Sequence, residues 1–193
     1  MPIEYEAFVR SDAEDVAPAS VREVARLANQ LRTALELESA AIDLAHIHGA
    51  SSSHVQAIVS AILKDRLRFD EEVVLTPENG IVSKPRPDFF YRLNDHEGVI
   101  AEVERGGTVT NNHDLKDVWK AHIAPDAQHL FLIVPNSNWR ADGGARERPF
   151  VRVTHCVGAF FGDPRREIDV LTCHVFGYGR TSLGDPAAVG SPG

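Results

Sequence analysis

Apolar residues recur at every third or fourth position in the first quarter of the chain, and this spacing predicts a long N-terminal helix over residues 19–49. The pattern ends at Gly49 and is interrupted by polar residues around Glu38. The positions that carry it are Val21, Val24, Ala28, Leu31, Leu35, Ile42 and Ala45. Such a helix is long for a compact chain, so three arrangements remain open: it packs over the core, it breaks near Glu38, or it pairs with a second subunit.

A second helical pattern covers residues 51–68, and a short strand pattern over 72–76 follows it. Ser53 and Gln56 have the spacing of an N-terminal capping box, which favours a capping role for Gln56 over the alternative that it points at a site. The segment 77–80 contains proline, asparagine and glycine, and therefore predicts a turn that leads into the next strand.

Residues 84–105 predict a β-hairpin that brings three carboxylates together. Strand-forming residues flank the turn residues 94–98 on both sides. A loop of three to five residues places Asp88 opposite Glu102, Val103 or Glu104. Because strand side chains alternate, Glu102 and Glu104 share one face of their strand. In two of the three registers, Asp88 therefore lies directly across from a glutamate on that same face.

The second half of the chain alternates between helical and strand patterns. A helix is expected after Asn112, with an apolar stripe at Leu115, Val118, Trp119 and His122. Residues 129–134 form a strand that is continuously apolar after His129, which predicts a central strand covered on both faces. Helical spacing returns over 149–161, and a last strand is expected over 167–176. This order predicts an α/β fold in which helices flank a mixed sheet.

The domain organisation follows from these elements and from the composition of the two ends. Residues 1–18 are acidic and predict a weakly ordered arm, whereas the Gly-, Pro-, Ser- and Ala-rich segment 179–193 predicts a disordered tail. Between them, residues 19–178 form a single domain made of the N-terminal helix 19–49 and a core over 51–178. A length of 193 residues with 43% hydrophobic content supports one core and does not require a second.

Composition narrows the setting of the protein. Two cysteines, no signal-peptide pattern and no apolar run near 18 residues predict a reduced, cytoplasmic protein without a membrane partner. A net charge of −8 argues against nonspecific binding of nucleic acid. Residues 140–166 nevertheless offer a local positive patch, or else an ordinary solvated face, through Arg140, Arg146, Arg148, Arg152, Arg165 and Arg166.

The carboxylates of the hairpin suggest a metal site, because acidic groups held this closely repel one another unless a cation joins them. Hard oxygen ligands suit Mg²⁺, which binds through one or two carboxylates and keeps several waters. Such an ion activates water and stabilises the charge on a phosphate under attack. The alternative is that Glu102 and Glu104 are the solvated face of an edge strand.

The order Pro87-Asp88, thirteen intervening residues, then Glu102-x-Glu104 resembles the PD-(D/E)XK nuclease superfamily, which has a restriction-endonuclease-like fold. The resemblance implies a three-layer core, with the N-terminal long helix as an addition. It also implies that Asp88 and Glu102 bind Mg²⁺ or Mn²⁺, with the backbone carbonyl of Val103 in reach. The lysine that usually ends the second motif is replaced by Glu104, as in some restriction enzymes with Glu-x-Glu.

Two further residues of the superfamily, a lysine and an acidic residue on a helix, have no clear equivalent in this sequence. In some members a lysine on the following helix replaces the missing lysine, and here Lys116 or Lys120 could do so. We select Lys116. The predicted catalytic residues are therefore Asp88, Glu102, Glu104 and Lys116. Family members often carry an acidic residue near the metal on the helix before the first core strand, but the helix predicted over 51–68 has no Glu and its only carboxylate is Asp65. Glu71 or Glu72 is the available substitute.

Two rival sites are weaker. His155-Cys156 and Cys173-His174 offer four zinc ligands, but adjacent residues on a helix or strand diverge, which favours buried cysteines and surface histidines. His113 is a second candidate general base, although a histidine at a helix start is usually incidental. The sequence thus predicts a Mg²⁺-dependent DNA endonuclease of restriction or defence type, acting as a homodimer. The alternative is a catalytically inactive nuclease-fold protein that binds DNA or another partner.

Overall fold

The computed structural model describes residues 3–49, 53–75, 85–104, 113–161 and 168–182. Its centre is a six-stranded sheet in the order β1-β8-β5-β4-β3-β2. Strands β8, β5 and β4 run parallel, whereas β1, β3 and β2 join antiparallel at the two sides, so the sheet is mixed. The strands are β1 (Glu4–Val9), β2 (Asp70–Glu71), β3 (Phe89–Asn94), β4 (Glu97–Val103), β5 (His129–Pro135) and β8 (Thr172–Tyr178).

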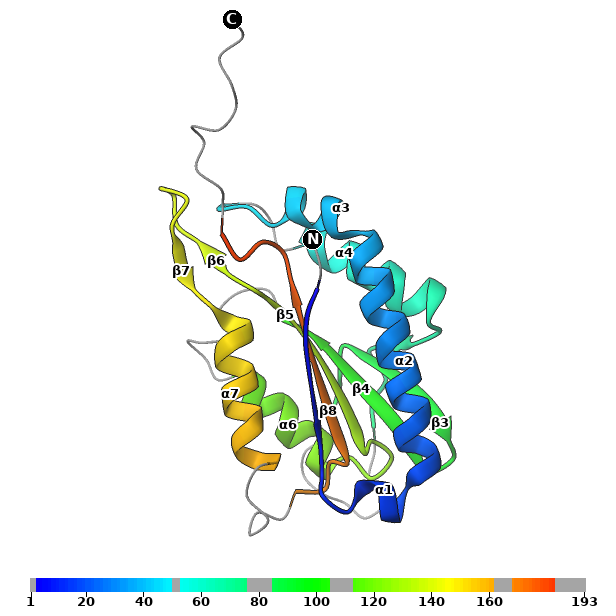
Figure 1. Ribbon diagram of the computed structural model, residues 1–193. Coiled ribbons are helices and arrows are strands. Elements are labelled where there is room, and N and C mark those ends of the chain that lie inside the picture. Colours follow the sequence, from blue (N-terminus) through cyan, green and yellow to red (C-terminus); the bar gives the residue numbers. More distant parts are fainter. Residues whose placement is uncertain (1–2, 50–52, 76–84, 105–112, 162–167, 183–193) are drawn as a thin grey trace, which may run out of the picture.

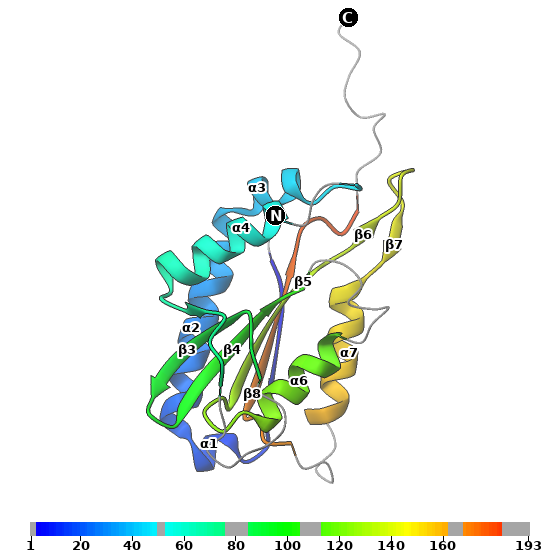
Figure 2. The ribbon, with the colours of Figure 1, turned by 180° about the vertical axis from the view of Figure 1, so that it is seen from behind.

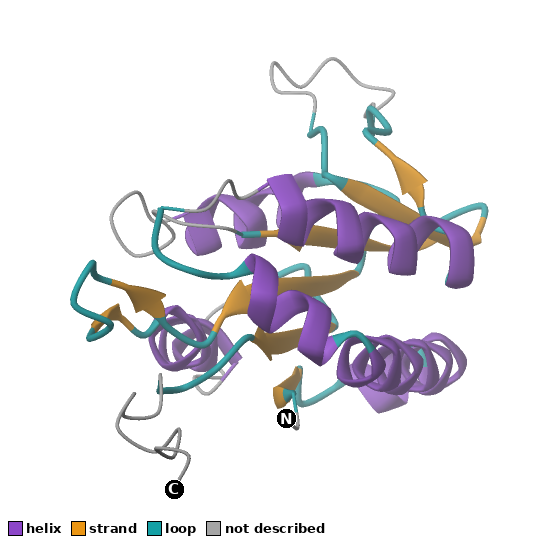
Figure 3. Cartoon of the chain, turned by 90° about the horizontal axis from the view of Figure 1, so that it is seen from above, coloured by secondary structure: helices purple, strands orange, loops and turns teal. Residues whose placement is uncertain are grey.

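Helices cover both faces of this sheet, as the view from above shows (Figure 3). One layer contains α2 (Pro18–Leu37), α3 (Ser39–Ala45), α4 (Ser53–Ala61) and the π-helix η1 (Ile62–Arg66). The other layer contains α6 (His113–Ile123) and α7 (Pro149–Phe161), which lie in front of the sheet in Figure 2. This arrangement confirms the predicted α/β fold with a helix-flanked mixed sheet.

The two faces follow directly from strand alternation. In β5, Phe131 and Ile133 point into the core under α2, while Leu130 and Leu132 point into the core under α6 and α7. Every residue of β5 is buried, as expected for the predicted central strand. None of the described helices is long and apolar enough to cross a membrane.

The N-terminal helix breaks at Glu38, which was one of the three arrangements left open. The backbone of Glu38 leaves helical geometry at φ −92° and ψ 5°, α2 ends at Leu37 and α3 begins at Ser39. The apolar stripe of α2 is buried against the sheet, since Val24, Leu31 and Leu35 have no exposed surface. That stripe is therefore not available as a subunit interface.

The prediction of a weakly ordered arm over 1–18 was wrong for the described part of that segment. Residues 4–9 form β1, which pairs antiparallel with β8 along its whole length, and a short helix α1 (Ala13–Val16) follows (Figure 1). Local composition does not reveal this pairing because the partner strand lies about 170 residues away in sequence. At the other end, residues 183–193 lie outside the described residues, whereas Gly179 and Thr181 accept hydrogen bonds from Asn136 and Ser137.

Three other boundaries differ from the sequence predictions. The strand expected over 72–76 is instead the two-residue β2, because Glu72 adopts a left-handed φ of 54° that ends regular pairing. The last strand begins at Thr172 and not at residue 167. A second, two-stranded sheet was not predicted and consists of β6 (Asn138–Trp139) and β7 (Ala145–Glu147).

Candidate functional site

The hairpin β3–β4 sets the register of the candidate site. Phe89 pairs with Ala101, so continuing the ladder by one residue places Asp88 directly across from Glu102. This is one of the registers that the sequence allowed. The connecting turn is tighter than predicted, since Asn94 already pairs with Glu97, and a bulge between Arg92 and Asn94 restores the register.

A glycine makes this tight hairpin possible. Gly98 lies where the ring of Phe90 and the carbonyl of Asp126 approach the backbone, and a Cβ at this position would lie 2.4 Å from the Phe90 ring. Any larger residue would therefore have to displace the Phe90 ring or the Asp126 carbonyl. Glycine thus allows Phe90 to pack over the start of β4.

Asp88 and Glu102 are tied to one another through the backbone. The Val103 N–H donates a hydrogen bond to Asp88 Oδ2 at 3.1 Å, and the Asp88 N–H donates to Glu102 Oε2 at 3.4 Å. Both residues belong to the face of the sheet that α6 and α7 cover, because Glu102 alternates with Ala101 and Val103 of the opposite core. Their side chains therefore meet at the end of β4, beneath the helical layer.

Glu102 is buried, with 3% of its surface exposed. Burial raises the pKa of its carboxyl to about 7, the neighbouring charge of Asp88 adds to the rise, and Lys120 opposes it. A buried carboxyl whose pKa is shifted by burial and by specific charged neighbours occurs both in functional sites and in structural ion-pair networks.

Helix α6 supplies a lysine to this carboxylate. Lys120 Nζ lies 2.6 Å from Glu102 Oε1 and 2.9 Å from Asp117 Oδ1, so one ammonium bridges two acidic residues. The Asp117 side chain is 4% exposed and that of Lys120 is 25% exposed. Burial lowers the pKa of Lys120, but Asp117 and Glu102 together raise it above its ordinary value, so the lysine carries its charge.

Asp117 is the least satisfied member of the group. Its Oδ2 atom is buried and has no hydrogen-bond partner among the described residues. Burial raises the pKa of this carboxyl well above its usual range, the charges of Glu102 and Glu104 add to the rise, and Lys120 opposes it. The site therefore brings several carboxylates around a single ammonium.

Glu104 follows directly after β4, and its backbone is fixed on both sides. Its N–H donates to the Ile133 carbonyl at 2.9 Å, and its carbonyl accepts the Tyr178 hydroxyl at 2.9 Å. The residue is half-buried and close enough to Asp117 to affect the pKa of that carboxyl. Glu104 is therefore held at the rim of the group that Glu102 and Asp117 form inside.

The structure brings together most of the predicted residues but exchanges the lysine. Lys116, which we selected from the sequence, is exposed, whereas its alternative Lys120 contacts Glu102. Val103 contributes its N–H to Asp88, and its carbonyl stays a predicted metal ligand. The side chain of His113 lies outside the described part of the chain.

Sequence reasoning missed Asp117 because it rotated α6 incorrectly. The predicted stripe included Leu115 and Trp119, but these side chains are 39% and 49% exposed. The buried face instead contains Asp117, Val118 and Ala121. The signal that could have revealed this face is the small apolar residue Ala121 at helical spacing from Asp117, with Ala124 following three residues later.

The predicted substitutes for a helix acid do not enter the group. Glu71 forms an ion pair with Lys64 at 2.5 Å, and Glu72 pairs with Arg86, all with exposed side chains. The backbone N–H of Glu72 donates to the Asp88 carbonyl, so Glu72 is a neighbour of the site through its main chain alone. In the described part of the chain, the additional carboxylate near Glu102 comes from Asp117 on α6 and not from the helix predicted over 51–68.

The rival zinc site is absent from the described residues, where no group of three or more His, Cys, Asp or Glu side chains is arranged to hold a metal ion. Cys173 and His174 face opposite cores, as adjacent strand residues do. The expectation of surface histidines was wrong for His174, which is 3% exposed, whereas His155 is exposed. The reason is that β8 is buried on both faces.

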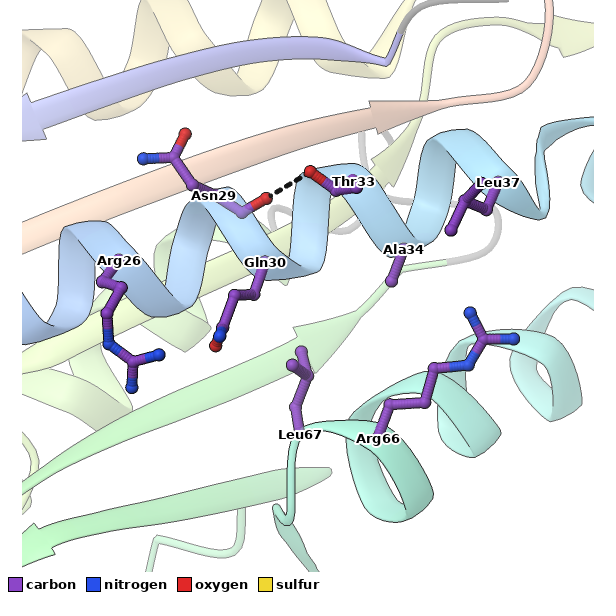
Figure 4. Close-up of a pocket in the computed structure, with 8 residues that line it drawn as sticks. All are labelled: Arg26, Asn29, Gln30, Thr33, Ala34, Leu37, Arg66 and Leu67. Atoms are coloured by element: carbon purple, nitrogen blue, oxygen red, sulfur yellow. Dashed lines mark hydrogen bonds between the residues drawn. The ribbon is translucent and has the colours of Figure 1, made fainter.

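A groove of about 480 Å³ lies between α2 and η1, in the other helical layer (Figure 4). The sheet separates it from the carboxylates of Asp88 and Glu102. Its cationic edge is partly neutralised, because Arg66 pairs with Glu38 at 2.6 Å and Arg26 pairs with Glu23 at 2.5 Å. The lining residues are Arg26, Asn29, Gln30, Thr33, Ala34, Leu37, Arg66 and Leu67.

The donor set near Glu102 fits Mg²⁺ or Mn²⁺ as an open site with two protein carboxylates. Mg²⁺ usually takes one or two carboxylates and completes its shell with water and substrate phosphate. Asp88 and Glu102 supply that number, and the single ammonium of Lys120 does not balance the negative charge around it. No group of three or more His, Cys, Asp or Glu side chains in the described part of the chain is arranged to hold a metal ion, so Asp88 and Glu102 offer at most two carboxylate ligands to a divalent cation.

No protein-family model and no curated protein sequence matches the chain. Among solved structures, the chain is similar to the crystal structure of restriction endonuclease BglII complexed with a DNA 16-mer. The two are 9% identical, the similarity covers 92% of this chain and 78% of that one, and the TM-score is 0.47. A likeness at this level carries no information about the chemistry of the present chain, which rests on its own residues.

Proposed function

We propose that the protein is a divalent-cation-dependent endonuclease that hydrolyses phosphodiester bonds of DNA. The observation that carries the proposal is the proximity of Asp88 and Glu102, joined by two backbone-to-carboxylate hydrogen bonds, with the Lys120 ammonium 2.6 Å from Glu102. Two carboxylates and a cation at one place are the groups that phosphodiester hydrolysis requires. The restriction or defence role is supported by the motif resemblance of Asp88, Glu102 and Glu104.

Each residue has a distinct task in this proposal. Asp88 and Glu102 would hold Mg²⁺ or Mn²⁺, with the Val103 carbonyl as a further ligand, and the bound ion would polarise the phosphate and activate water. Glu104 orients the attacking water and accepts its proton. Lys120 takes the role predicted for Lys116 and stabilises the negative charge that develops on the phosphate.

Exposed arginines support DNA as the partner. The β6–β7 hairpin projects beyond β5 and continues into α7 (Figure 1). Because β4 and β5 are parallel, this hairpin emerges at the same end of the sheet as the carboxyl end of β4. Four arginines on it and on the first turn of α7 are exposed, and they are Arg140, Arg146, Arg148 and Arg152.

The homodimer remains part of the proposal, because one site of this kind cuts one strand and two-fold symmetry supplies the second cut. The predicted interface was the helical segment 21–47, and the buried apolar stripe of α2 leaves only its C-terminal part available. Exposed apolar residues near the α2–α3 junction are available, and they are Leu37, Leu44 and Ile47. Light scattering at micromolar concentration distinguishes a monomer of 21.2 kDa from a dimer of twice that mass.

A cleavage assay tests the proposed activity. Supercoiled plasmid is incubated with the wild-type protein in Mg²⁺, in Mn²⁺ and in EDTA, beside Asp88→Asn and a surface control, Lys64→Met. We expect nicked and linear DNA with either metal, and none with EDTA or with Asp88→Asn. Replacing Lys120 by Met should reduce cleavage more than replacing Lys116 does. Intact plasmid in both metals would contradict the proposed activity, and a parallel RNA substrate identifies the nucleic acid.

A second candidate function is that of a DNA-binding protein which keeps the fold without catalysis. The Glu102–Lys120–Asp117 network favours it, because an ammonium already compensates the buried Glu102 carboxylate. DNA binding in a mobility-shift assay, together with intact plasmid in every metal, would identify this function.

A further inference from the structure

The charge at the end of β4 is unevenly compensated. Glu102 and Asp117 are both almost completely buried, yet they share one ammonium, that of Lys120. Asp117 Oδ2 has no partner among the described residues, and Asp88 adds another carboxylate on the far side of Glu102. A buried carboxylate without compensation is costly, so Lys120 is the group that makes this cluster tolerable in the absence of a metal ion.

The two contacts of Lys120 differ in their mechanical origin. Asp117 and Lys120 lie three residues apart on the same helix, so their contact is built into α6 and survives small movements of that helix. The contact with Glu102 instead joins α6 to β4, so it spans two separate elements, although the same Nζ atom makes both contacts. A change that moves the ammonium away from β4 would therefore break the Glu102 contact without separating two residues of one helix.

Access also favours such a movement. The Lys120 side chain is 25% exposed, whereas those of Glu102 and Asp117 are each 4% exposed. The lysine thus has a path towards water, while the two carboxylates remain in place. A divalent cation that approaches the buried Glu102 carboxylate therefore has to displace the more exposed Lys120 ammonium.

We propose that Lys120 is a resident counter-ion, which a divalent cation displaces from Glu102 while Asp117 retains it. This inference rests on the proposed cation site of Asp88 and Glu102. Asp117 is then a positioning residue, because it holds the displaced ammonium next to the bound ion and the substrate phosphate. The protein binds its metal in competition with its own lysine.

Competition between Lys120 and the metal predicts the direction in which metal affinity changes when the lysine is removed. Removing the ammonium leaves the Glu102 carboxylate with the Asp88 N–H but without an ion-pair partner, so the metal no longer has to break an ion pair in order to bind. Lysine variants without charge should therefore bind the metal more tightly than wild type does. If Lys120 served only as a structural bridge, its removal would loosen the site and weaken metal binding.

The experiment measures Mn²⁺ binding to the full chain at pH 8.5, with free Mn²⁺ determined by electron paramagnetic resonance. The variants are Lys120→Met, Lys120→Arg, which keeps a cation, and Asp117→Asn with Lys120→Met, which removes one charge of each sign. Lys64→Met is the surface control. The double variant provides a test even where Lys120→Met alone fails to fold, because it leaves no uncompensated Asp117.

We expect Lys120→Met and the double variant to bind Mn²⁺ at least about fivefold more tightly than wild type, the lower end of typical coupling between two sites. Lys120→Arg and Lys64→Met should show no gain. If the wild type binds Mn²⁺ and both Lys120→Met and the double variant bind it equally or more weakly, the inference about Lys120 is wrong. The proposed cation site is then unaffected. No Mn²⁺ binding by any folded variant would instead overturn the cation site itself.

Discussion

Two sets of buried polar side chains lie on opposite faces of the same sheet and solve the problem of burial differently. Under α2, His129 and His174 are 0% and 3% exposed, and their rings bond Thr172 Oγ1 at 2.9 Å and the Tyr5 hydroxyl at 2.8 Å. Under α6, Glu102 bonds the ammonium of Lys120. The first set contains neutral partners, whereas the second contains a charged one.

The pKa values record the difference. Burial lowers the pKa of His129 to about 3, with a contribution from His174, and it lowers that of His174 to about 4, so both rings are neutral. Burial also disfavours the charge on Glu102, but Lys120 opposes this effect and the pKa of the carboxyl stops at about 7. Burial is therefore the largest cause in both sets and favours the neutral form, and the Lys120 ammonium limits the rise in the pKa of Glu102 without reversing it.

The largest expected effect comes from removing the charged partner. Lys120→Met leaves Glu102 and Asp117 buried beside one another, and breaking a buried pair in this way typically costs about 3 to 5 kcal/mol of the free energy of unfolding. Urea denaturation at pH 8 measures this loss. The surface control Lys64→Met should stay within about 0.5 kcal/mol of wild type. A loss below about 1 kcal/mol for Lys120→Met would show that the pair contributes little.

A carboxylate at the rim of the charged set separates chemistry from stability. Glu104→Gln keeps the shape of the side chain but removes a general base, so we expect cleavage to fall at least about 100-fold while Mn²⁺ binding stays nearly unchanged. Single-turnover plasmid cleavage measures the rate. Undiminished cleavage by Glu104→Gln would show that Glu104 has no role in the mechanism. If the wild type is inert and Glu104→Lys cleaves DNA, the protein is instead a nuclease that has lost its activity.

The two sets should respond to pH with opposite signs. Each histidine has a folded pKa below its ordinary value of 6.5, so its stabilising effect is present above pH 6.5 and is lost as the pH falls towards 4. Glu102 has a folded pKa of about 7, above its ordinary 4.5, so its contribution is present below pH 4.5 and is lost as the pH rises through 7. Between pH 4.5 and 6.5 the contributions partly cancel.

Single substitutions reveal the opposing slopes. Glu102→Gln should make the free energy of unfolding rise more steeply with pH between 5 and 6.5, by about 1.4 kcal/mol per pH unit. His129→Asn, which keeps an acceptor for Thr172, should make the rise shallower by a similar amount. Denaturation curves at several pH values measure both slopes. An unaltered slope in His129→Asn would show that this ring is not the neutral group described above.

The smallest effect on stability is expected where charges remain in water. Arg146→Ala with Arg148→Ala removes two exposed guanidinium groups from the β6–β7 region, so the free energy of unfolding should change by less than about 0.5 kcal/mol. If both arginines contact DNA phosphates, the slope of log affinity against log salt concentration should fall by about 2. A salt titration of DNA binding measures the slope. The same slope in the variant would place the DNA elsewhere.

Local pattern determined the hairpin that carries the acidic pair. Turn residues between two runs of strand formers predicted β3 and β4, and alternation placed Glu102 and Glu104 on one face. The register followed to within three choices, because only a few loop lengths connect two strands. The continuous apolar run of β5 and the helical spacing of α7 also predicted their elements, since both patterns are complete within their own segments.

Tertiary structure decided which groups meet this pair. The rotation of α6 about its own axis depends on the surface that the sheet offers, so the sequence favoured Lys116, and packing selected Lys120 and added Asp117. The acidic segment 4–9 becomes a strand because β8 offers an open edge to it, and no local property of that segment announces its partner. The periodicity of a segment can be read from its own residues. Which face of a helix is buried depends on the elements it packs against, and these lie far away in the chain.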